Sequence, residues 1–161
     1  AWTQATADAG RTGSQRLREV TEVAAPLGVA AALRLEPGTS VVVRRRVMYL
    51  DDKPVELTDS YYPSEIARGT RLADDRKIPG GAPTLLRELG HELRHVDEDV
   101  SARLATETEQ ELLGLSGPEP VIVLVRVSSS SDGVPVEVGV MTMLAADRHL
   151  RYQLTIGAAD A

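Results

Sequence analysis

The sequence predicts an α+β fold with a central antiparallel β-sheet and flanking helices. Strand-like segments follow one another through short polar turns, which is typical of β-hairpins. Short helical segments lie between some of them, without the regular strand–helix–strand alternation of a parallel sheet. The chain has 161 residues, of which 42% are hydrophobic. It is therefore long enough for one domain with its own core.

The composition narrows the class of protein. The formal net charge of −6 argues against nucleic-acid binding by this chain itself, because such binding usually needs a basic surface. The sequence has no cysteine and no apolar run near the roughly 20 residues of a membrane span. We therefore expect a cytoplasmic protein that does not interact with membranes. The chain begins with Ala1 rather than Met, so we expect it to be a piece of a longer protein.

Two helices and one strand are expected in the first forty residues. Trp2–Ala9 is rich in alanine and is followed by Gly10, which favours a short helix. Arg16–Val23 carries spaced apolar residues and predicts a strand. Ala25–Leu33 is apolar at nearly every position, so it predicts a short buried helix.

Val41–Pro63 predicts a β-hairpin whose first strand contains three consecutive arginines. Alternation of side chains places Arg44 and Arg46 on one face of the sheet and Arg45 on the other. The arginines could simply decorate the surface. The alternative is that Arg46, with Arg44 beside it, holds an anionic group through charge-assisted hydrogen bonds.

The length of the hairpin turn decides which residues face each other. A three-residue turn at Asp51–Lys53 pairs Leu50 with Pro54. This register places Arg46 opposite Thr58, about 5 Å away on the same face. A two-residue turn would separate the two side chains.

The second half of the chain continues the alternation of strands and helices. Thr106 and Glu109 match a capping box that begins a helix ending near Leu113. Gly90 ends the helix that precedes this region. The remaining expected elements are a helical turn at Ser64–Arg68, a helix at Thr84–Leu89 and strands at Arg94–Leu104, Val121–Val127, Val134–Leu144 and Leu150–Ile156.

The segment His91–His95 matches the HExxH pattern of zinc hydrolases. In those enzymes the pattern lies on a helix, so that both histidines reach one zinc ion. Here Gly90 ends a helix, and the residues after His95 alternate like a strand, on which positions i and i+4 lie about 13 Å apart. We therefore expect no metal site, and a zinc hydrolase is the least favoured alternative.

Glu137 shares one face of its predicted strand with Gly139, Met141 and Met143. A solvated strand face would normally carry lysine, threonine or serine. Methionines suit the adaptable wall of a binding pocket. The alternative is that they pack beneath a helix.

Several short motifs follow one another in a characteristic order. They are Arg46, Asp51-Asp52-x-Pro54, Ser60-Tyr61-x-Pro63, a Gly-Gly pair before a short helix, Glu107-x-Glu109-x-Glu111-Leu112-Leu113, Gly133-x-Pro135-x-Glu137 and Asp147-Arg148. The set spans about Trp2 to Ile156, and its most specific part is the hairpin motif. It resembles the UTRA domain, the effector-binding domain of the HutC subfamily of GntR-type bacterial transcription regulators.

This resemblance implies a chorismate-lyase-like fold with a ligand pocket against the antiparallel sheet. Residues 1–161 would form one ligand-binding domain without a cofactor. The resemblance also implies a homodimer and an N-terminal winged helix–turn–helix, absent from this chain, through which alone the protein binds DNA. In such regulators a small anionic metabolite binds the effector domain and changes the affinity of the dimer for its operator.

The resemblance also implies particular site residues. Family members that bind sugar phosphates use Arg-x-Arg in the first hairpin strand, which is Arg46 and Met48 here. They use a glutamate two residues before the Ser-Tyr pair, and this position is Thr58. These departures imply a less polar ligand, such as a partly apolar carboxylate or phosphate. The other implied positions are Glu137, Met143, Gly81, Ala82 and Thr3, and Met141 lies on the same wall.

The fold leaves one enzymatic alternative, an enzyme of the chorismate-lyase type. Such an enzyme needs a general acid and arginines for two carboxylates. Glu137 and Arg46 together supply few of the groups that this reaction needs. We therefore favour an effector-sensing domain of a repressor rather than an enzyme. Arg46 would anchor the anionic group, and Thr58 and Glu137 would supply hydrogen bonds.

Overall fold

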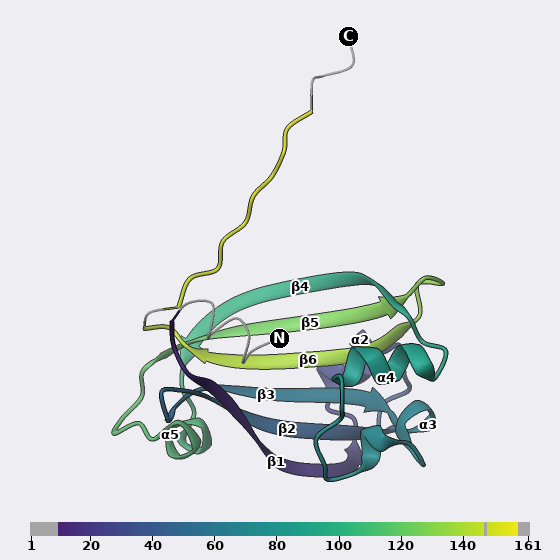
Figure 1. Ribbon diagram of the computed structural model, residues 1–161, viewed down its shortest axis with the longest axis horizontal. Helices are drawn as coiled ribbons and strands as arrows, with labels where there is room; N and C mark the ends of the chain where they lie inside the picture. The colour runs from purple at the N-terminus through teal and green to yellow at the C-terminus, as the bar shows by residue number, and fades with distance from the viewer. Residues whose placement is uncertain (1–9, 147, 158–161) are drawn as a thin grey trace.

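Six antiparallel strands form one continuous sheet in the computed structural model, which describes residues 10–146 and 148–157. Their spatial order is β1-β2-β3-β6-β5-β4 (Figure 1). The last strand, β6, therefore lies inside the sheet, where it pairs with β3 on one side and with β5 on the other. The α+β fold with a central antiparallel sheet is confirmed. The strands are β1 (Gly13–Ala24), β2 (Ser40–Leu50), β3 (Lys53–Pro63), β4 (Leu93–Leu104), β5 (Pro120–Ser130) and β6 (Pro135–Leu144).

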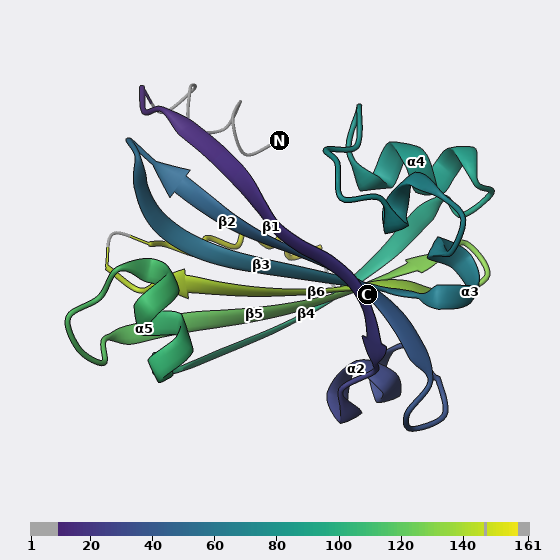
Figure 2. The same cartoon turned by 90° about the horizontal axis from the view of Figure 1, so that it is seen from below.

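Short helices cover both faces of the sheet (Figure 2). One face packs against α2 and α5, and the other packs against α3, the 3₁₀ helix η1 and α4. No helix within the described residues is long and apolar enough to cross a membrane. The helices are α2 (Leu27–Ala32), α3 (Ser64–Ala67), η1 (Arg71–Ala73), α4 (Ala82–Glu88) and α5 (Glu107–Leu113).

Alternation along β2 and β3 divides the core into two layers. We call the surface that carries Arg45 and Asp59 the α5 face, and the surface that carries Arg44, Arg46 and Thr58 the α4 face. The valines beside Arg45 pack in the clusters beneath α2 and α5. The α4 face buries its largest cluster beneath α3, η1 and α4. The predicted separation of the three arginines is therefore confirmed.

The turn between β2 and β3 has two residues, Asp51 and Asp52, so the prediction of a three-residue turn is wrong. Both residues have positive φ angles, 49° and 63°, which suit a tight hairpin turn. One additional residue, Val55, bulges from β3 and shifts the register back. Arg46 therefore pairs with Thr58 as predicted, although for a different reason.

The capping box at the start of α5 is confirmed. The Thr106 hydroxyl accepts a hydrogen bond from the Glu109 N–H at 3.2 Å, and the Glu109 carboxylate accepts one from the Thr106 N–H at 2.9 Å. Arg103 on β4 donates to both oxygens of this carboxylate, at 2.6 and 2.9 Å. These contacts set the position of α5 against the sheet.

Three predictions concern segments near the ends of the chain, and their outcomes differ. The first strand begins at Gly13, earlier than predicted, because it pairs with β2 along nearly its whole length. The strand predicted at Leu150–Ile156 is absent, since no neighbouring strand within the described residues pairs with this segment. The helix predicted at Trp2–Ala9 lies outside the described residues.

Arg44 holds the loop around η1 onto the sheet. Its buried guanidinium donates hydrogen bonds to the backbone carbonyls of Leu72, Asp74 and Arg76 at 2.8, 2.7 and 2.6 Å. A longer contact of 3.4 Å reaches the carbonyl of Arg71. These contacts give Arg44 a structural role, and the expectation that it also helps Arg46 to hold an anion stays a prediction.

We expect Arg44→Met to lower the free energy of unfolding by about 3 kcal/mol, because it leaves several carbonyls without a donor. Urea unfolding followed by circular dichroism measures this change. The matched control is Arg68→Met, since Arg68 makes an exposed ion pair with Glu22 and such pairs contribute about 0–1 kcal/mol. Equal losses for the two variants would contradict the anchoring role of Arg44.

Candidate functional site

The predicted site residues of the three central strands lie together on the α4 face. The sheet register places them in adjacent rows, and paired side chains on neighbouring strands lie about 5 Å apart. They therefore form one continuous patch, which we call the α4-face patch. In strand order β2-β3-β6 its rows are Met48-Glu56-Met143, Arg46-Thr58-Met141 and Arg44-Ser60-Gly139.

Arg46 is the half-buried cation near the middle of this patch. Its guanidinium donates to the Ser60 hydroxyl at 3.2 Å and to the side-chain oxygen of Gln15 at 3.3 Å. Both partners are neutral and both contacts are long. Among the described residues no carboxylate forms an ion pair with Arg46. Within the described structure its charge is therefore not neutralised by a carboxylate.

Arg45 shows how differently the neighbouring arginine is used. It lies on the α5 face and forms ion pairs with Asp59 at 2.6 Å and with Glu19 at 3.2 Å. These two carboxylates neutralise its charge within the protein. Two arginines that are adjacent in sequence therefore have opposite roles, and Arg46 is the better anion ligand.

Gly139 leaves a gap in the side-chain layer of the patch. It lies between Ser60 on β3 and Arg126 on β5, in the row next to Arg46. A Cβ atom at this position would lie 3.7 Å from the end of Met141 and 4.0 Å from the Arg126 carbonyl, which are ordinary contacts. A methyl-sized group therefore fits at Gly139 without displacing its neighbours.

Glu56 joins the patch to the chain after β6. Its carboxylate accepts a hydrogen bond from the Thr58 hydroxyl at 2.8 Å and forms an ion pair with Arg148 at 3.2 Å. Both Glu56 and Thr58 are buried. Because the Thr58 proton is engaged in this contact, the Thr58 oxygen is left to act as an acceptor toward a ligand.

Glu137 is held by Tyr62 at one end of the patch. The buried tyrosine hydroxyl donates to the Glu137 carboxylate at 2.5 Å. Burial, followed by the nearby Glu137 charge, raises the pKa of the Tyr62 hydroxyl well above its usual value, so the hydroxyl stays protonated. Ala82 at the start of α4 packs against the cluster that contains Tyr62, and Gly81 directly precedes it.

The methionines of the patch differ in their accessibility. Met48 and Met143 are 5% and 2% exposed, so they form the floor of the patch. Met141 is half-buried and lies beside the gap at Gly139. Met141 is therefore the methionine that a ligand can reach most directly.

The fixed charges on the α4-face patch favour an anion. Arg44, Arg46 and Arg148 carry positive charge, and Glu56 and Glu137 carry negative charge. The sum is one positive charge, although the chain as a whole is acidic. The partly buried setting increases the strength of these interactions relative to water.

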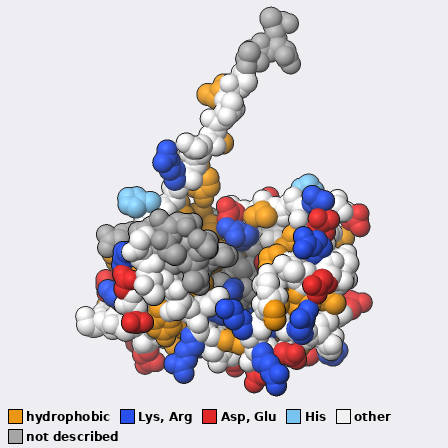
Figure 3. Space-filling model, in the orientation of Figure 1, with side chains coloured by type: hydrophobic (Ala, Val, Ile, Leu, Met, Phe, Trp, Pro, Cys, Tyr) orange, Lys and Arg blue, Asp and Glu red, His pale blue; other side chains and the backbone are white. Residues whose placement is uncertain are grey.

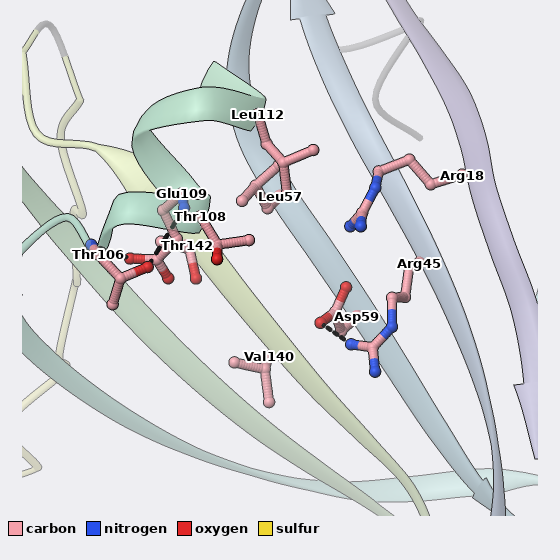
Figure 4. Close-up of a pocket in the computed structure, with 10 residues that line it drawn as sticks. All are labelled: Arg18, Arg45, Leu57, Asp59, Thr106, Thr108, Glu109, Leu112, Val140 and Thr142. Carbon is pink, nitrogen blue, oxygen red and sulfur yellow. Dashed lines mark hydrogen bonds and ion pairs between the residues drawn. The ribbon is translucent and has the colours of Figure 1, made fainter. Parts of the chain in front are cut away.

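A separate cavity of about 280 Å³ lies on the α5 face, between the sheet and α5 (Figure 4). Its charged lining includes Asp59, Arg45 and Glu109. Asp59 pairs with Arg45, and Glu109 pairs with Arg103. Arg18 also lines the cavity and takes part in none of the ion pairs among the described residues. Burial raises the pKa of the Asp59 carboxyl, and the charge of Arg45 opposes this rise. The ion pairs of Asp59 and Glu109 hold the sheet and α5 around this cavity.

Residues outside the predicted set contact predicted site residues, among them Ser60 with Arg46, Tyr62 with Glu137 and Glu56 with Thr58. Ser60 and Tyr62 alternate with Thr58 along β3, so strand periodicity contained the signal for both. Glu56 lies on the same face for the same reason, but its pairing with Arg148 brings together positions 92 residues apart and needs the folded chain. Thr3, the remaining predicted position, lies outside the described residues.

The HExxH segment does not form a helix. His91 precedes β4 and His95 lies within it, as the alternation predicted. Across the described residues no group of three or more histidine, aspartate or glutamate side chains is arranged to hold a metal ion. The geometry of a zinc hydrolase is therefore not present at this segment.

Comparisons with known proteins agree with the fold and with the motif pattern. The family model of the UTRA domain matches residues 8–149. An HTH-type transcriptional regulator of Streptomyces coelicolor is 34% identical over 127 residues, which cover 77% of this chain and 47% of that protein. A second HTH-type regulator, from Rhizobium meliloti, is 32% identical over 121 residues, covering 74% and 48%. The chain thus spans about half the length of these curated relatives.

Solved structures with the same architecture are effector domains of regulators. The effector domain of PhnF from Mycobacterium smegmatis superposes with a TM-score of 0.82 at 21% identity, covering 97% of this chain and 95% of that one. The ligand-binding domain of a protein described as a GntR-family regulator from Bordetella bronchiseptica has a TM-score of 0.76 at 28% identity, covering 89% and 91%. The chain therefore belongs to the UTRA domain family of GntR-type transcriptional regulators.

Proposed function

We propose that this domain binds a small anionic metabolite on the α4-face patch and thereby controls the DNA affinity of the regulator that contains it. The observation that carries this proposal is the environment of Arg46. Its half-buried guanidinium has neutral partners at 3.2 and 3.3 Å, within a patch of net positive charge. A charged donor with such weak internal contacts is suited to an external anion.

The surroundings of Arg46 suggest the chemistry of the ligand. Its anionic group contacts Arg46 and the Ser60 hydroxyl. A hydroxyl or amine donor on the ligand reaches Thr58 or Glu137, and an apolar part lies over Gly139 and Met141. Gly81, Ala82 and Thr3 complete the site in this proposal. Met48 replaces a second arginine, so a partly apolar carboxylate or phosphate is a better fit than a sugar phosphate.

Regulation follows from differential binding. We propose that the effector binds one arrangement of a cytoplasmic homodimer more tightly than another and so shifts the equilibrium between them. The affinity of a winged helix–turn–helix, elsewhere in the same protein, for a palindromic operator then rises or falls. We favour a repressor, released or strengthened by the effector.

We do not propose an enzymatic role. A chorismate-lyase reaction requires cationic partners for two substrate carboxylates. Among the described arginines of the patch, Arg44 is buried and binds backbone carbonyls, and Arg148 pairs with Glu56, which leaves Arg46 for a substrate. Incubation with chorismate should therefore yield no 4-hydroxybenzoate above the uncatalysed rate. Measurable turnover would replace the sensor proposal with an enzyme.

Arg46→Gln should weaken effector binding by about 10- to 100-fold, because it removes a charge-assisted hydrogen bond of roughly 1.5–3 kcal/mol. Isothermal titration with a library of small carboxylates and phosphates measures the change in Kd. The matched control is Arg45→Gln on the opposite face of the same strand, which should leave Kd unchanged. Equal Kd values for wild type and Arg46→Gln would refute the anchoring role.

Gly139→Val should block the apolar part of the site while leaving the fold intact. The new Cβ meets its neighbours at ordinary distances of 3.7 and 4.0 Å, and valine suits a strand. We expect at least a tenfold loss of effector affinity with little change in thermal stability. Gly117→Val is the control, since its Cβ would meet nothing within 4 Å. If Gly139→Val binds normally, the ligand does not lie over this strand.

A further inference from the structure

The cavity on the α5 face is separate from the α4-face patch. Its lining comes from β1, β2, β3, β6 and the first turns of α5, and it lies on the opposite side of the sheet from Arg46. Its volume of about 280 Å³ is close to the lower end of the range for ligand pockets, roughly 300–1,000 Å³. The cavity is therefore large enough for a small metabolite, and its charged groups indicate which kind.

A bulge in β1 adds Arg18 to this face of the sheet. In the pairing of β1 with β2, Leu17 lies opposite Arg46 and Glu19 lies opposite Arg45, so Arg18 has no partner of its own. Glu19 occupies the paired position and neutralises Arg45 at 3.2 Å. The bulge therefore supplies one cation beyond those that the ladder pairs, and this cation lines the cavity (Figure 4).

Exposure alone does not distinguish Arg18 from other arginines. Basic and acidic side chains are interspersed over the surface seen in Figure 3, so an exposed arginine by itself indicates no site. Arg18 differs because it lies beside a cavity and because, among the described residues, no carboxylate forms an ion pair with it. Its charge is therefore not neutralised within the described structure.

Asp59 presents a complementary group to the same cavity. Its Oδ2 atom accepts a hydrogen bond from Arg45 at 2.6 Å, whereas its Oδ1 atom is buried and has no hydrogen-bond partner within the described structure. Burial raises the pKa of the Asp59 carboxyl, and the charges of Arg45 and Arg18 oppose this rise. A buried acceptor without a donor is energetically unfavourable, so a ligand that donates to Oδ1 removes an existing cost.

The charges of the lining sum to zero. Arg18 and Arg45 are positive, and Asp59 and Glu109 are negative. The Glu109 carboxylate is already bound by Arg103 at 2.6 and 2.9 Å. The α4-face patch, in contrast, carries one net positive charge. A neutral cavity with one unpaired cation and one unpaired carboxylate oxygen suits a ligand that itself carries both charges.

We propose that the α5-face cavity is a second binding site, which takes a small α-amino acid with an apolar side chain. The carboxylate of the ligand binds the Arg18 guanidinium, and its ammonium group donates to the Oδ1 atom of Asp59. The apolar side chain of the ligand lies against Leu57, Leu112 and Val140, which form the apolar part of the lining. This inference goes beyond the proposed function and does not depend on it, because the two sites share no residue.

The first experiment compares ligands that differ by one charged group. The probes are L-valine, L-leucine and L-methionine, and at least one should bind the full chain in isothermal titration with a Kd below about 1 mM. Each is compared with its analogue without the ammonium group and its analogue without the carboxylate, which for leucine are 4-methylpentanoate and 3-methylbutylamine. Either analogue should bind at least tenfold more weakly, because it leaves Asp59 or Arg18 without a partner.

The second experiment changes the two groups of the protein. Arg18→Gln and Asp59→Asn should each weaken binding of the amino acid at least tenfold, because each removes a charge that the ligand needs. Arg16→Gln is the matched control, since Arg16 is an exposed arginine on the same strand that does not line the cavity. Circular dichroism shows whether each variant is folded. If Asp59→Asn does not fold, Arg18→Gln and the analogues decide the result.

Three results would overturn the inference. They are the lack of saturable binding by all three amino acids up to about 10 mM, equal affinity for an amino acid and its analogues, and equal losses in Arg16→Gln and Arg18→Gln.

Arg46→Gln separates the second site from the effector site. This variant should bind the amino acid as the wild type does, because Arg46 lies on the opposite face of the sheet. A tenfold loss in this variant would place the amino acid on the α4-face patch, which would overturn the second site and support the proposed effector site. Conversely, failure of the effector proposal leaves the comparison of Arg18→Gln with Arg16→Gln unaffected.

Discussion

The register between β2 and β3 is the constraint on which the rest of the structure depends. Side chains along a strand alternate between faces, so a slip of one residue would exchange the two faces of the hairpin. The two-residue turn would produce such a mismatch, and the bulge at Val55 corrects it. The correction places Arg46, Thr58 and the neighbouring β6 side chains in one row. The candidate site exists because the hairpin contains this additional residue.

The same alternation separates three consecutive arginines into three environments. Arg44 is buried and donates to backbone carbonyls, so it stabilises the loop around η1. Arg45 is neutralised by carboxylates on the opposite face. Arg46 has only neutral partners within the described structure and lies near a residue without a side chain, Gly139. The position of these arginines in the sequence therefore does not indicate their roles. The hydrogen-bond and ion-pair partners of each guanidinium do.

Unpaired backbone groups at the edge of a sheet and apolar side chains exposed to solvent are both energetically unfavourable. This domain has an instance of each, at β4 and at the segment that follows Arg148. Arg148 binds Glu56, and Glu56 accepts a hydrogen bond from Thr58, so the segment after β6 is linked to the α4-face patch.

The sequence by itself determined the fold class, the family and the strands, because hydrophobic periodicity, caps such as Thr106–Glu109 and the hairpin motif are local signals. It also determined which face carries Arg46. Tertiary structure decided that Arg44 binds backbone carbonyls and that Glu56 pairs with Arg148, because these contacts join positions far apart in the chain. The periodicity at Leu150–Ile156 was correct for a strand, but strand formation requires a neighbour that a single copy does not provide.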